Sequence, residues 1–135
     1  MKKIFRAVWF YALLGLAAGV FYREFTKFHE FAGKTILSNT HVHSFVLGTL
    51  FFLIVMILYK VFDLSKSKGL TAWFWLYNVS LIGLLGTIAA RGILQVLEIE
   101  GTMLSHIAGT FHTMLAGAII WFIFILKKAV FSTQK

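Results

Sequence analysis

Four long apolar runs constrain this chain more than any other feature of its sequence. They cover about residues 4–22, 40–62, 70–94 and 103–126, and each is long enough to cross a bilayer as a helix. A helix satisfies its backbone hydrogen bonds internally, which a membrane interior demands. Apolar residues make up 59% of the chain and charged residues 13%, proportions that exclude a soluble domain. The sequence therefore predicts an all-α, integral membrane four-helix antiparallel bundle in a single domain, residues 1–135.

The basic residues are distributed unevenly between the connections. The N-terminus, the connection 60–68 and the C-terminus together hold nine of the 13 lysines and arginines, and the other two connections hold four. Because positive charge accumulates on the cytoplasmic side of membrane proteins, both termini are expected inside, N-in/C-in. Membrane orientation thus accounts for the net charge of +8, and the only partner that this charge predicts is the lipid bilayer, with no nucleic acid.

Local patterns refine the first span and its neighbour. Gly15 and Gly19 form a GxxxG pattern, which is typical of closely packed membrane helices, and we interpret this span as retained and not as a signal peptide. The connection 23–40 carries Phe25, Phe28 and Phe31 at three-residue spacing, which predicts a partly amphipathic interfacial helix. The chain has no proline, so no kink is expected in any span.

Four histidines lie inside the second and fourth apolar runs: His41, His43, His106 and His112. An ionisable side chain within a membrane span is costly and is by default a functional candidate. Counting about 1.5 Å per residue from the lysines that end both spans, the four form two approximate layers, His43 with His112 and His41 with His106. All of them are expected in the outer half of the membrane.

Helical periodicity predicts which way these side chains face. His41 and His43 are about 200° apart and therefore leave nearly opposite faces of their helix. On the fourth span, His106 and His112 flank a stripe of small residues that we expect to line the bundle interior and that also offers a surface for a homo-oligomer. The stripe consists of Ser105, Gly109, Thr113 and Gly117.

These histidines predict a b-type haem site with axial ligands from spans two and four, His41 or His43 paired with His106 or His112. Imidazole is a common axial ligand, and facing helices often build cofactor sites in bundles. Without cysteine, covalent haem attachment and thiolate ligands are both excluded. Arg91 is either a snorkelling interfacial anchor or the partner of a haem propionate. The expected role is electron transfer with a redox partner, or gas or haem sensing.

Two alternatives use the same side chains. The first is a zinc or copper site for metal transport or sensing, with His41, His43, His106 and His112 as ligands. The second is a structural or assembly subunit without cofactor, whose histidines bond only to the backbone and to their neighbours. No catalytic residue is predicted under any of these interpretations.

The chain also resembles known families at two scales. His41-Val42-His43 through Leu47-Gly48, with the patch Gly109 to His112, resembles a bacterial family of small four-helix membrane proteins of unknown function. This resemblance implies a multi-pass protein of the bacterial cytoplasmic (inner) membrane. Locally, the same His-x-His segment is similar to a helix in the catalytic subunit of cbb3-type oxidases and nitric oxide reductases. That similarity implies that His41 and His43 each ligate a haem iron.

Overall fold

The computed structural model describes residues 1–99 and 103–132, and over these residues the chain is helical without strands. Four helical segments are long and apolar enough to cross a membrane, which confirms the predicted all-α, four-span fold. The second of them is built from three consecutive helical pieces, and two short 3-10 turns lie in the connections. The elements are α1 (Lys2–Phe28), η1 (Ile36–Ser38), α2 (Asn39–His43), η2 (Ser44–Leu50), α3 (Phe51–Val61), η3 (Leu64–Lys66), α4 (Leu70–Val96) and α5 (Met103–Ser132).

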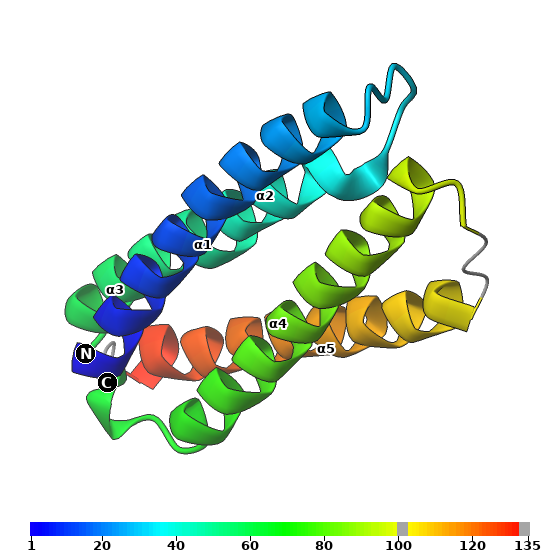
Figure 1. Cartoon of the computed structure of the whole chain (residues 1–135). Coiled ribbons are helices and arrows are strands. Elements are labelled where there is room, and N and C mark those ends of the chain that lie inside the picture. Colours follow the sequence, from blue (N-terminus) through cyan, green and yellow to red (C-terminus); the bar gives the residue numbers. More distant parts are fainter. Residues whose placement is uncertain (100–102, 133–135) are drawn as a thin grey trace.

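The helices pack as two antiparallel pairs, α1 with the second span and α4 with α5 (Figure 1). The start of α1, the α3–α4 connection and the end of α5 lie together at one end of the bundle, which we call the lysine-rich end. Toward the other end, α5 diverges from α2, while α4 stays in contact with η1 (Figure 1). The backbones of the two pairs thus approach each other most closely at this other end, where η1 and α2 meet α4.

Glycines bring α1 and the second span into close contact. A Cβ on Gly15 would lie 3.0 Å from the Phe45 ring, and one on Gly19 would lie 3.8 Å from His41. In the opposite direction, a Cβ on Gly48 would overlap Tyr11. The GxxxG pattern of the first span therefore serves close helix packing, as predicted, because both of its glycines face the second span.

An aromatic cluster joins α3, α4 and α5 near the lysine-rich end. Phe51 stacks on Tyr77 with ring centroids 4.6 Å apart and meets Phe122 at 5.9 Å. Trp73 packs on Phe122 at 4.6 Å and donates its indole N–H to the Ala118 carbonyl at 2.8 Å. These bulky side chains make the contact between α5 and α3, and they also join α5 to α4.

Hydrogen bonds between helices reinforce this packing inside the apolar interior. The Tyr11 hydroxyl donates to the Asn78 side-chain oxygen at 2.8 Å, and the Ser44 hydroxyl donates to the Tyr11 carbonyl at 2.8 Å. Ser44 is fully buried and Asn78 nearly so. Polar side chains in membrane helices commonly serve in this way, each satisfied by a neighbouring helix.

A π-helical segment, η2, interrupts the second span directly after the two histidines. The Phe51 N–H donates to the carbonyls of Val46 and Gly48 and skips Leu47, its α-helical acceptor. The Tyr77 hydroxyl donates to the Leu47 carbonyl at 2.8 Å instead. The second span is therefore not a continuous α-helix, although it contains no proline.

The connection after α1 differs from the predicted interfacial helix. Phe25 and Phe28 belong to α1, which continues to Phe28. The chain then returns through Thr35, whose hydroxyl donates to the Gly92 carbonyl of α4 at 2.9 Å. A Cβ on Gly92 would lie 2.5 Å from the backbone of Leu37. This close approach fixes the start of the second span against the far end of α4.

Candidate functional site

His43 projects from the second span toward the α4–α5 pair. It begins a row of half-buried side chains, His43, Leu47 and Phe51, and Phe51 contacts Tyr77 and Phe122. Positions four residues apart drift by about 40° per step in an α-helix, and the wider π turn offsets this drift. The row therefore stays on one face, the face toward α4 and α5.

The His43 ring is fixed by its own helix. Its Nδ1 lies 2.8 Å from the Asn39 carbonyl oxygen, and a carbonyl can only accept, so Nδ1 carries the proton. The lone pair of a neutral ring is then on Nε2. A histidine that ligates a metal typically donates its other ring N–H to such a group.

His112 on α5 shows the same arrangement. Its Nδ1 lies 3.0 Å from the Ala108 carbonyl oxygen, which again leaves the lone pair on Nε2. Ile119 and Leu126 follow His112 at seven-residue intervals, so all three lie on one flank of the helix. Ile119 and Leu126 pack against the core, whereas His112 is exposed.

Arg91 on α4 lies in line with Trp73. The two are 18 residues apart, which is about five turns at 3.6 residues per turn. Trp73 fills the space between α3 and α5, because it touches Phe51, Phe52 and Phe122. The half-buried Arg91 therefore lies on the side of α4 that faces between the second span and α5.

The position of each residue along its own helix can be counted from the contact between Phe51 and Phe122. At about 1.5 Å per residue, His43 is about 12 Å and His112 about 15 Å beyond that contact, away from the lysine-rich end. Arg91 is about 21 Å beyond Tyr77, which stacks on Phe51, and so lies farther out than both rings. All three residues thus lie beyond this aromatic contact, away from the lysine-rich end, on three different helices.

His41 is placed differently. It faces α1, where its ring packs over Gly19 and lies near Tyr22, with ring centroids 6.4 Å apart. Its Nδ1 is buried and, among the described residues, has no hydrogen-bond partner. The expected opposite-face arrangement of His41 and His43 is present, with α1 on one side and α4–α5 on the other.

His106 and the small-residue stripe of α5 face outward. His106, Gly109 and Gly117 are exposed, and a Cβ on either glycine would meet nothing within 4 Å. The expectation that this stripe lines the bundle interior is wrong. The interior face of α5 instead carries Ala108, Leu115, Ala118, Phe122 and Ile125.

Within residues 1–99 and 103–132, no three His, Cys, Asp or Glu side chains lie close enough to hold a metal ion. His29 repeats the Nδ1 contact, 2.9 Å from the Phe25 carbonyl, but it is exposed at the end of α1. The acidic Glu24 and Glu98 are exposed as well. The described acidic residues therefore add no ligand set to the histidines.

One polar residue inside an apolar run, Asn78, was not identified from the sequence. Asn78 stands in the middle of the third apolar run, where a polar side chain is conspicuous. The structure explains it as the partner of Tyr11, and its amide N–H also donates to the Phe74 carbonyl at 2.7 Å. Asn78 therefore serves helix association and is not part of the histidine site.

Comparison with known proteins identifies the family. No curated protein and no solved structure shows significant similarity to the chain. Residues 1–129 match the family model described as "Protein of unknown function (DUF2871)", which covers all four spans. That match agrees with the resemblance to a family of small four-helix membrane proteins, while the oxidase-like His-x-His similarity rests on its motif alone. The chain belongs to the DUF2871 family.

Proposed function

We propose that this chain is a b-type haem-binding membrane protein, with His43 and His112 as axial ligands, that serves electron transfer or gas or haem sensing. The observation that carries the proposal is the matched state of the two rings. Each has Nδ1 against a carbonyl of its own helix and Nε2 as the free lone pair. This is the tautomer that an iron ligand needs, and the backbone fixes it in advance.

The directions of the two side chains support the same pairing. His43 continues the row of Leu47 and Phe51, and His112 lies on the flank continued by Ile119 and Leu126. Two imidazoles from different helices suit a haem, whereas a zinc or copper site wants three or four converging ligands. Arg91 supplies the positive charge that a haem propionate would pair with.

Membrane orientation and assembly form part of the proposal. We infer an N-in/C-in protein of the bacterial cytoplasmic membrane, from the lysine asymmetry, with the histidines in its outer half. We also infer a homo-oligomer formed through the exposed stripe of Gly109, Thr113 and Gly117, since small residues let membrane helices approach closely. A redox partner would then dock at the outer end, nearest the histidines.

An absorption spectrum of protein purified from haem-replete cells tests the proposal. We expect a Soret band that sharpens and shifts on reduction, as six-coordinate haem with two imidazoles does. His43→Ala and His112→Ala should each abolish it or reduce haem retention at least about tenfold, as the loss of an axial ligand implies. Both variants should insert normally, because the apolar spans still drive insertion.

Two histidine controls make the result specific. His29→Ala removes a ring with the same Nδ1 contact but outside the spans, and His106→Ala removes one that faces outward. Both should keep the wild-type spectrum. Bound zinc or copper without a Soret band would establish the metal alternative. If all four substitutions lowered haem retention equally and only slightly, no histidine would be a specific ligand. That result would support the cofactor-free alternative.

A further inference from the structure

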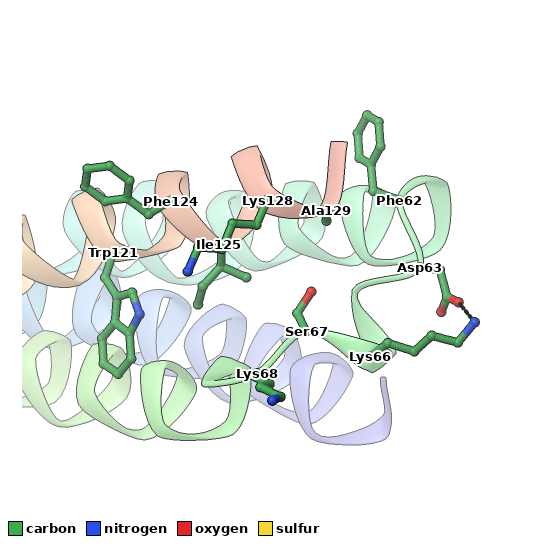
Figure 2. Close-up of a pocket in the computed structure, with 10 residues that line it drawn as sticks. All are labelled: Phe62, Asp63, Lys66, Ser67, Lys68, Trp121, Phe124, Ile125, Lys128 and Ala129. Atoms are coloured by element: carbon green, nitrogen blue, oxygen red, sulfur yellow. Dashed lines mark ion pairs between the residues drawn. The ribbon is translucent and has the colours of Figure 1, made fainter. Parts of the chain in front are cut away.

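The lysine-rich end contains a cavity that the haem proposal does not use. It has a volume of about 550 Å³ and lies between the α3–α4 connection and the last turns of α5 (Figure 2). Its polar wall carries Lys66, Lys68 and Lys128, with Asp63 as the acidic member. Lys66 pairs with Asp63 at 3.2 Å, so two lysines remain to attract an anion.

The α5 side of this cavity is mostly apolar, with Lys128 as its charged member. Trp121, Phe124 and Ile125 line it, and Figure 2 shows Trp121 and Ile125 projecting from α5 on the same side as Lys128. The Trp121 ring covers Gly69, where an added Cβ would lie 3.4 Å away. Tryptophan beside lysine is the combination found where a membrane helix meets the headgroup region.

This side continues along the outside of α5 as an apolar surface. Trp121 and Phe124 are exposed, Phe124 by 57%, and the exposed Ile120 lies farther toward the middle of the helix. An acyl chain would lie along this surface while a headgroup occupies the cavity.

We propose that this cavity binds the headgroup of an anionic phospholipid, with Lys68 and Lys128 on the phosphate and the acyl chains along Trp121 and Phe124. Three features favour a lipid over a soluble anion: the site lies at the end of the membrane spans, its α5 side is mostly apolar, and that side continues along the helix. Basic pockets between membrane helices bind anionic headgroups in this way. The inference is independent of the haem proposal.

Native mass spectrometry of the full chain in detergent, titrated with phosphatidylglycerol or phosphatidylcholine, tests it. Phosphatidylglycerol should bind in preference to phosphatidylcholine. Lys68→Gln and Lys128→Gln should each weaken phosphatidylglycerol binding about fivefold, the effect of one lysine near an anionic lipid. Lys127→Gln is the matched control, since it removes the same charge from the neighbouring residue, which does not line the cavity.

A variant that binds phosphatidylglycerol more strongly would show that the losses in the lysine variants do not come from unfolding. Asp63→Asn releases Lys66 from its ion pair and should strengthen phosphatidylglycerol binding. Equal losses in Lys127→Gln and Lys128→Gln would show diffuse surface attraction and overturn the site. Displacement of phosphatidylglycerol by inorganic phosphate would show a simple anion site and overturn the lipid assignment.

Discussion

The Tyr77 hydroxyl donates a 2.8 Å hydrogen bond to the Leu47 carbonyl, which the π segment of the second span deprives of its α-helical donor. An unsatisfied carbonyl is costly inside a membrane, and a side chain of a neighbouring helix removes that cost. The π turn also keeps His43 in line with Leu47 and Phe51. The irregular turn, the tyrosine and the direction of the histidine are therefore one structural unit.

Tyr77→Phe should destabilise the bundle by about 0.6–1.7 kcal/mol, from the average to the maximum found for hydrogen bonds between membrane helices. The ring still stacks on Phe51, so the loss reports the hydroxyl alone. Thermal unfolding in detergent measures it. Tyr59→Phe removes a hydroxyl from a half-buried ring near the end of α3 and should leave the transition unchanged. Equal stability of all three proteins would show that the Leu47 carbonyl does not need Tyr77.

Gly48→Ala should destabilise the protein more than any other single added methyl on the second span. The new Cβ would overlap Tyr11, whose ring is fully buried and stacked on Phe52, and overpacking of this kind costs about 1–3 kcal/mol. Detergent-dependent unfolding followed by circular dichroism gives the difference. Gly86→Ala adds the same methyl to an open surface of α4 and should stay within about 0.5 kcal/mol of wild type. A reversed ranking would contradict the packing of α1 on η2.

Part of this fold follows from the sequence, and the rest depends on contacts that periodicity does not encode. The four spans were predictable from apolar length, and the packing of α1 from Gly15 and Gly19. The face of α5 was not predictable, because a helix in lipid is apolar on all sides and its interior face has no hydrophobic signature. Small Gly109 and Gly117 indicated an interior that Leu115 and Phe122 form instead.

The candidate site was likewise predictable only in part. Polar side chains inside apolar runs identified the histidines, and similar distances from the flanking lysines paired His43 with His112. Which of His41 and His43 faces α4 depends on the π turn, and that turn depends on Tyr77 from another span. The side of α4 on which Arg91 lies follows from its alignment with Trp73, and the position of Trp73 between α3 and α5 is known only from the structure.

Membrane orientation can be tested directly because the chain has no cysteine of its own. Ser67→Cys, in the α3–α4 connection, should resist an impermeant thiol reagent on intact cells and react after lysis. Glu98→Cys, in the α4–α5 connection, should react on intact cells, as the lysine asymmetry predicts. The opposite pattern would invert the bundle and place the histidines near the cytoplasm.

Asp63 should titrate below its ordinary pKa. The hydrogen bond from the Ser65 side chain, and then the contact with Lys66, lower the pKa of this exposed carboxyl from 3.8. A depressed folded pKa stabilises the folded state above the unfolded pKa, and this contribution is lost as the pH falls through the folded value. Carboxyl carbon shifts in an NMR titration of the protein in micelles measure it. Ser65→Ala should raise the pKa, and Lys60→Gln should leave it unaltered.

Arg91→Gln separates the anchoring role of Arg91 from ligation. If Arg91 pairs with a haem propionate, its loss should weaken haem binding about tenfold or more, as expected when a charge-assisted hydrogen bond of about 1.5–3 kcal/mol is removed. The Soret position of the haem that remains should not change, because His43 and His112 are untouched. Haem titration of the apoprotein gives the affinity, and the spectrum gives the ligation.

Arg23→Gln is the control for this prediction. It removes an exposed arginine from the same side of the predicted topology, and it should change neither the haem affinity nor the spectrum. Equal affinities for Arg91→Gln and Arg23→Gln would show that Arg91 is an interfacial anchor and would leave the two histidines as the whole of the site.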